Sequence, residues 1–343
     1  MSPPNHTFDD LLLPKTKAAE WYSIYNELQS ARKKGIFDKC LFRSGECEAP
    51  PIKSHLLSRS WLQQIADSSH HVLEFDFSTS QLTANAARIE PKRVGINEAT
   101  VFPGFFNSHD TELFACLEKQ DFAGTRTQIL SLAYRSVSQQ VCSKHQMVGC
   151  NLPRSLSADN HPLAPFAAAE FRRLLLLMKK KLCLETLMSC ATGGLETYAV
   201  FFKKKPTVFA ATTILPTVTF TGRALDTSRH DWLTLSVMPH GDGGCALFSW
   251  ERAAAKNASL LVKSLASIPP ALVTQAILNL VFEASEDFVL APAWWAGLGE
   301  NKQKELLRRY ARTFTENRPP STTTLIPSKT VWADWTVVRR EFI

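Results

Sequence analysis

The chain has 343 residues, and its hydrophobic fraction of 45% and charged fraction of 21% are those of an ordinary globular protein. No apolar run approaches the ~20 residues of a membrane-spanning helix, which excludes a protein built around such spans. The formal net charge of +7 favours an anionic partner, with nucleic acid as the first choice.

The eight cysteines are expected to be reduced. Several of them lie in apolar segments with helical periodicity, where a free cysteine acts as a small hydrophobic residue. The first residues contain no basic segment leading into an apolar one, as a secretory signal would. A reducing compartment is therefore favoured over a disulfide framework, and we expect a cytoplasmic protein.

The first half of the sequence is expected to be mainly helical, because apolar residues recur there at intervals of three and four. Its predicted elements are a helix over 18–34, a short helix around 61–65, a strand over 71–77, a loop over 91–104, and helices over 110–117 and 125–145. A segment rich in Ser, Asn and Pro over 151–165 predicts a hinge. We therefore expect two domains, 1–150 and 151–343.

The second half combines helices with β-branched and aromatic segments, which predicts an α+β fold. Its predicted elements are a helix over 166–190 that continues past two glycines to 202, a β-rich segment over 208–221, strands over 232–237 and 245–250, helices over 253–266, 270–284 and 300–313, and a closing strand over 332–342. The glycine-rich turn over 241–244 predicts a β-hairpin.

Two short motifs offer metal-binding or catalytic chemistry. Cys40 and Cys47 are separated by six residues, and His55 follows in the same region. The pair His109-Asp110 opens a predicted helix. Thiolates and an imidazole near tight turns are ligands of a structural zinc ion, although two unrelated cysteines near a turn give the same pattern.

This order of motifs resembles the treble-clef core of the HNH, or His-Me finger, nucleases over residues 36–118. The segment 52–60, IKSHLLSRS, is similar to the strand that carries the catalytic histidine in that family. The segment 105–110, FFNSHD, resembles the family's second knuckle and metal-binding position. A similar pattern occurs in bacterial proteins without an established activity. The resemblance implies a treble-clef-like zinc module packed on helices, and the patterns of the second half place a C-terminal antiparallel sheet with helices after it.

By position, the resemblance implies that Cys40, Cys47 and His109 ligate a structural zinc ion. It makes His55 the general base that activates water, and it places Asp110 as a ligand of a catalytic Mg²⁺ or Mn²⁺ ion. One carboxylate is thin support for such a cation, which prefers several oxygen ligands.

The chain departs from the family at Phe106, where the fourth zinc ligand is expected and where a phenyl ring cannot coordinate metal. Either another side chain completes the zinc site or this member has lost it. The asparagine that the family carries on its helix is also not evident, although Asn107 lies close by.

Two further groups have both a functional and a structural interpretation. Cys142, His145 and Cys150 would supply metal ligands, or they are incidental residues at the end of a long helix. A basic block predicts either phosphate contacts or a solvated helix face, and it consists of Arg172, Arg173, Lys179, Lys180 and Lys181.

These observations lead to two hypotheses of different classes. The first is an HNH-like protein associated with nucleic acid, with His55 and Asp110 making it a metal-dependent endonuclease. The second is a non-catalytic interaction protein in which the Cys/His knuckle is a structural staple and the C-terminal domain binds a protein partner.

Overall fold

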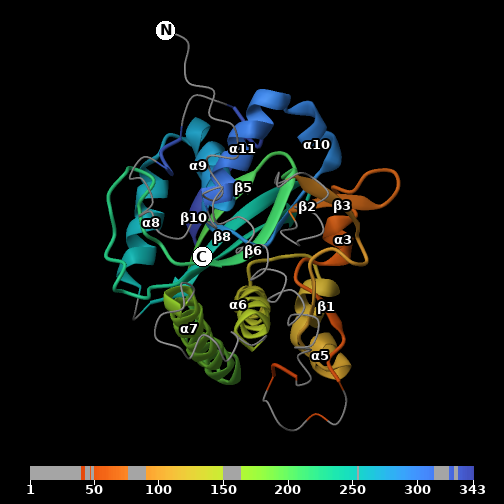
Figure 1. Ribbon diagram of the computed structural model, residues 1–343, viewed down its shortest axis with the longest axis vertical. Coiled ribbons are helices and arrows are strands. Elements are labelled where there is room, and N and C mark those ends of the chain that lie inside the picture. The colour runs from red at the N-terminus through yellow and green to blue at the C-terminus, as the bar shows by residue number, and fades with distance from the viewer. Residues whose placement is uncertain are drawn as a thin grey trace.

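An eight-stranded antiparallel sheet runs through the centre of the molecule and separates two layers of helices (Figure 1). The computed structural model describes residues 40–42, 47, 50–75, 90–149, 164–252, 255–312, 324–327 and 331–343, with only the backbone at 146–149 and 164–170. The prediction of an α+β fold is confirmed. The helix expected over 18–34 and most of the expected hinge over 151–165 lie outside the described residues.

The strands are β1 Lys53–His55, β2 His71–Phe75, β3 Pro91–Gly95, β4 Val101–Pro103, β5 Leu195–Phe202, β6 Val208–Ile214, β7 Leu233–His240, β8 Gly243–Glu251, β9 Phe288–Leu290 and β10 Val337–Phe342. The helices are α3 Arg59–Leu62, α5 Asn107–Glu118, α6 Arg126–Gly149, α7 Ala164–Ser189, α8 Lys256–Ser267, α9 Pro270–Ala284, α10 Pro292–Gly297 and α11 Glu300–Arg312. The large sheet has the strand order β10-β5-β8-β7-β6-β9-β2-β3, and β1 and β4 form a separate two-stranded sheet.

Both faces of the large sheet are covered, so its central strands are buried along almost their whole length. On one face, Leu235 and Val237 of β7 pack in a core with α8, α9 and α11. On the other face, Met238 of β7 joins a second core with α6, α7 and the N-terminal module, which consists of strands β1 and β4 and helices α3 and α5. In a strand that is buried on both faces, side chains of both orientations enter an apolar core. The sequences of these strands are therefore continuous apolar runs without alternation.

The hairpin predicted around 241–244 is confirmed by the pairing of β7 with β8. Its two-residue turn begins at Gly241, whose φ of +54° lies in the left-handed region that glycine adopts without steric cost. Gly243 is required for a different reason. A Cβ atom at this position would lie 2.1 Å from the carbonyl oxygen of Phe202 on the neighbouring strand.

Two secondary-structure predictions were wrong. Residues 91–104, expected as a loop, contain β3 and β4, and β3 pairs along its length with β2. This edge strand begins at a proline and carries exposed charges, so its sequence lacks an apolar alternation. The expected helix beyond the glycines is instead strand β5, because its Thr, Tyr, Val and Phe side chains fill both faces of the sheet.

The sheet takes strands from both sides of residue 150, where a domain boundary was expected. Strands β2 and β3 precede that position, and β9 joins them to the strands of the second half through the pairing of Leu73 with Leu290. Helix α6, also from the first half, packs on β5, β6 and β7. In the part of the chain that the structure describes, no helix is long and apolar enough to cross a bilayer.

Candidate metal centre

The candidate metal centre lies where a β-ribbon meets the first turn of α5. Strands β1 and β4 pair with Ser54 opposite Phe102, and α5 begins four residues after β4 ends. The segment around Cys40 is bound to the loop between β4 and α5, since the Leu41 amide donates a hydrogen bond to the Gly104 carbonyl at 2.8 Å. This pairing carries Cys40 to the N-terminal end of α5, which presents His109.

Cys40, Cys47 and His109 converge on one point, as the sequence predicts for zinc ligands. Each sulfur lies 3.4 Å from the same ring nitrogen, Nδ1 of His109. All three donor atoms lie within 4.8 Å of one another. Among the residues that the structure describes, this is the only group of three or more potential ligands that comes together in this way.

The geometry of this Cys/His cluster fits a tetrahedral zinc ion. With Zn–S bonds of about 2.3 Å and a Zn–N bond of about 2.0 Å, tetrahedral angles place each sulfur about 3.5 Å from the nitrogen. The observed 3.4 Å agrees with this value. One imidazole nitrogen has a single lone pair or a single hydrogen, so it cannot form an ordinary hydrogen bond with two thiols at once. One metal ion bound by all three atoms would account for both contacts.

A backbone amide and aromatic rings surround the Cys/His cluster and shield part of it from water. The Phe106 backbone amide donates a hydrogen bond to Cys40 Sγ at 3.3 Å, and Cys40 is only 3% exposed. The rings of Phe42 and Phe106 meet the His109 ring edge-on, with centroids 5.1 Å and 6.1 Å away. Such an apolar shell limits solvent access and strengthens the bonds between a metal and its ligands.

The fourth tetrahedral position has no protein ligand among the described residues. Phe106, at the position where the resemblance to HNH nucleases implied this ligand, contributes its amide to Cys40 and its ring to His109. The cluster therefore offers a Cys₂His donor set. A zinc ion held by three protein ligands completes its shell with water or another small ligand.

The two expected catalytic residues, His55 and Asp110, have different surroundings. His55, at the end of β1, lies opposite Val101, and its Nε2 is 3.3 Å from the Ile96 carbonyl oxygen. Asp110, in the first turn of α5, has a buried Oδ1 atom without a hydrogen-bond partner. Within the described ranges, no hydrogen bond joins these two side chains.

A second carboxylate at this end of the ribbon is already engaged. Glu118, the last residue of α5, accepts a hydrogen bond from Ser58 at 2.7 Å and pairs with Arg135 at 2.9 Å. Ser58 follows His55 by three residues, so Glu118 is one of the acidic groups that the fold brings towards this region, together with Glu74, which accepts a hydrogen bond from the Thr100 amide. One of the Glu118 oxygens joins α5 to α6 through Arg135, and the other joins α5 to the start of α3 through Ser58.

The basic block on α7 is directed largely inward. Arg173 pairs with Glu286 at 3.3 Å, Lys180 with Glu251 at 3.4 Å, and Lys181 with Glu185 at 2.7 Å. Only Arg172 and Lys179 of the five predicted phosphate-binding residues are exposed. These five side chains therefore do not form one continuous cationic face.

The second predicted ligand set is only partly described. The Cys142 thiol is buried and lies 3.7 Å from the Pro103 carbonyl oxygen, to which it donates. His145, one turn further along α6, is exposed, and Cys150 lies outside the described residues.

A buried ionic cluster, which the sequence analysis missed, lies between α6, α7 and the start of β9. Lys144, 3% exposed, contacts both oxygens of Glu286 at 3.1 Å, and Gln139 donates a hydrogen bond to Asp287 at 2.7 Å. Gln140 donates to the other oxygen of Asp287. The only sequence signal is a lysine and two glutamines within an apolar helix.

The two adjacent carboxyl groups of this cluster have opposite pKa shifts. Burial disfavours the charged form of Glu286, but Lys144 and Arg173 outweigh it and lower the pKa of this carboxyl. Burial and the neighbouring negative charge of Glu286 raise the pKa of Asp287 to about 7. The cluster thus keeps one ionised acid and one acid that titrates near neutrality.

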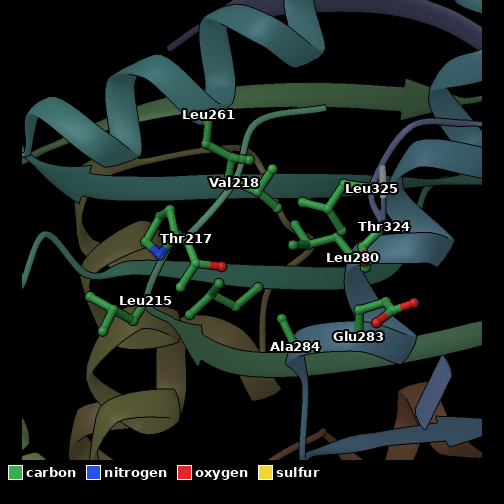
Figure 2. Close-up of a pocket in the computed structure, with 11 residues that line it drawn as sticks. Leu215, Thr217, Val218, Leu261, Leu280, Glu283, Ala284, Thr324 and Leu325 are labelled. Atoms are coloured by element: carbon green, nitrogen blue, oxygen red, sulfur yellow. The ribbon is translucent and has the colours of Figure 1, made fainter. Parts of the chain in front are cut away.

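A separate hollow of about 350 Å³ lies on the opposite face of the sheet (Figure 2). It is lined mainly by aliphatic side chains, including Val218, Leu261 and Leu280. Its carboxylate, Glu283, forms an ion pair with Arg309 at 3.2 Å. This hollow is lined by no Cys, His or Lys side chain, and its one carboxylate is already paired.

The class of protein that fold and site define is an α+β protein with a Cys₂His cluster capable of holding a metal ion. Comparison of the chain with protein-family models, curated protein sequences and solved structures gives no match.

Proposed function

We propose that this protein is a non-catalytic interaction protein whose N-terminal module is held together by one structural zinc ion. The convergence of Cys40, Cys47 and His109 on a single point carries the proposal. The three ligands come from two segments that are far apart in the sequence, so a zinc ion would tie the segment around Cys40 to α5. Binding free energy of this kind is folding free energy for the module.

The interactions of the other candidate residues favour a structural role over catalysis. A metal-dependent nuclease needs a cation next to the base that activates water. His55 contacts a backbone carbonyl, and the nearby Glu118 is paired with Arg135. These interactions help to hold the ribbon and α5 in place, and among the described residues none of them joins His55 to a carboxylate.

Metal analysis of the purified protein tests the zinc site. We expect about one equivalent of zinc in the wild type and a loss of most of it in Cys47→Ser. The matched control is Cys190→Ser, which removes an exposed thiol at the end of α7 and leaves the zinc content unchanged. A folded wild-type protein without metal would contradict the proposal.

A gain-of-ligand variant sharpens this test. In Phe106→Cys, a thiolate stands next to the amide that already contacts Cys40, so a fourth ligand becomes available. We expect this variant to retain zinc at chelator concentrations that strip the wild type. Equal zinc retention by both proteins would argue against a metal at this position.

A second candidate function is metal-dependent cleavage of nucleic acid. It is favoured by the position of His55 at the end of a β-ribbon that leads into α5, with a ring that is only partly buried. In this proposal His55 activates water, and Asp110 binds Mg²⁺ or Mn²⁺.

Incubation with DNA and RNA in the presence of each cation tests this candidate. Cleavage that disappears in His55→Ala and persists in His71→Ala, a partly exposed histidine on β2, would support it. The absence of cleavage under all conditions would leave the structural role as the better account.

A further inference from the structure

Helix α7 exposes a row of large apolar side chains on its outer surface. Phe171 is 49% exposed, Leu175 51%, Met178 49% and Leu182 64%. Side chains of this size at about half exposure leave roughly 400 Å² of apolar surface, which is the size of the largest apolar patch on a typical monomer, and such a patch is often functional. The opposite side of the helix is already packed, since Leu174, Leu177 and Leu184 belong to the core with α6.

The spacing of the exposed row is that of a coiled-coil seam. Successive members are separated by four, three and four residues, which corresponds to alternating d and a positions over two heptads. A helix that lies in a membrane surface usually presents a broader apolar face and many cations. The narrow α7 row instead fits one facing helix.

The charges beside the row indicate which helix fits. Arg172 and Lys179 directly follow the two d positions, at the flanking e positions of the heptads, and both are exposed. The glutamate of the next heptad, Glu185, is paired with Lys181 at 2.7 Å and accepts a hydrogen bond from Tyr134. Among the side chains of α7 that the structure describes, which begin at Phe171, the exposed charges beside the row are thus cationic.

We propose that the exposed row on α7, formed by Phe171, Leu175, Met178 and Leu182, binds one amphipathic helix of a partner protein that carries Glu or Asp beside its apolar positions. A second copy of this chain is disfavoured, because antiparallel pairing of two α7 helices brings e positions together and opposes Arg172 and Lys179 to their own counterparts. Acidic residues in those places turn the same contacts into ion pairs.

This inference rests on the proposed interaction role but not on the zinc ion. Zinc content and binding at α7 are measured separately, so a protein without zinc that still binds the partner helix would refute only the metal site. A zinc-loaded protein that fails to bind would refute only the α7 surface.

Binding of a labelled peptide, followed by fluorescence anisotropy, tests the proposal on the full chain. The probe is a helical peptide of about 21 residues with Leu at a and d and Glu at e and g. Repulsion between glutamates opposes self-association of this peptide. The control peptide carries Lys in place of Glu. We expect the acidic peptide to bind at least about tenfold more tightly than the basic one.

Variants then assign the contact to α7. Leu175→Ser combined with Leu182→Ser should weaken binding at least about tenfold, and exposure of both side chains keeps the fold intact. Val338→Ser, which alters an apolar residue of β10 that is 60% exposed, is the matched control and should have no effect. The double change Arg172→Glu and Lys179→Glu should reverse the preference towards the basic peptide.

Three results would overturn the proposal. The first is that the two peptides bind equally or not at all. The second is a wild-type dimer in sedimentation that Leu175→Ser dissociates. The third is that neither peptide binds while the protein binds vesicles of phosphatidylserine and phosphatidylcholine through Leu175 and Leu182. The second result would assign the row to a copy of this chain, and the third to a membrane surface.

Discussion

Replacing Asp287 by Asn should make the protein more stable at neutral and alkaline pH. In the wild type, burial and the adjacent Glu286 raise the pKa of Asp287 from 3.8 to about 7. Above that pH the folded protein must hold two neighbouring carboxylates, and it is Glu286 that forms the ion pairs with Lys144 and Arg173. An asparagine keeps an acceptor for one glutamine and adds an amide donor for the unpartnered Oε1 atoms of Gln139 and Gln140.

The sign and the size of the effect follow from proton linkage. Between about pH 4 and pH 7 the folded state binds a proton at Asp287 that the unfolded state has lost, so the free energy of unfolding falls as pH rises. A pKa shift of this size lowers the free energy of unfolding by at most about 4 kcal/mol. About 2 to 3 kcal/mol of this loss develops between about pH 5 and pH 8. Because the Glu286 side chain is 21% exposed, water reaches the edge of the cluster, and we expect the lower end of this range.

Urea unfolding of both proteins at several pH values measures this difference. The stability advantage of Asp287→Asn should grow between about pH 5 and pH 8 and then remain constant. A matched control is Asp334→Asn, an exposed aspartate whose pKa is lowered by its hydrogen bond with Lys204, and which should give no such rise. A constant difference between wild type and Asp287→Asn across this range would refute the shifted pKa of Asp287.

Other substitutions and conditions test separate parts of the structure. Lys144→Met should lower the free energy of unfolding by about 3 kcal/mol in urea titrations, because it leaves Glu286 with one cationic partner in a largely buried site. Gly243→Ala should lower the melting temperature by several degrees, since its Cβ would meet the Phe202 carbonyl, whereas Gly95→Ala has open space and should change it little. Acidification should release zinc from the Cys/His cluster, because protons compete for the thiolates, and metal retained after dialysis at about pH 4 would contradict thiolate ligation.

Most helices and the central hairpin followed from sequence patterns, and the failures have physical causes. Helices α6, α7, α8, α9 and α11 were predicted from their apolar periodicity and from Gly or Pro near their ends. Strand β5 was missed because a strand buried on both faces shows no alternation that distinguishes it from a helix. Strand β3 was missed because its pairing with β2 depends on a partner and not on its own charged sequence.

The candidate site was predictable only in its residue types. The spacing of Cys40 and Cys47 indicated a pair of thiols, but a distance of 62 residues separates Cys47 from His109, and their meeting depends on how the β1–β4 ribbon is folded onto α5. The Asp287 cluster gave no comparable pattern, because its shifted pKa arises from burial and from neighbours on α6, on β2 and in the segment before β9.

The sequence by itself therefore determined the α+β class, most helices and the set of potential ligands, since these depend on local periodicity and side-chain chemistry. Tertiary structure decided that the Cys/His cluster forms, that β2 and β3 join the strands of the second half, and that three of five basic residues on α7 point inward. It also decided that Phe171, Leu175, Met178 and Leu182 remain outside the core. Each of these outcomes depends on contacts between segments far apart in the chain, which local sequence preference does not encode.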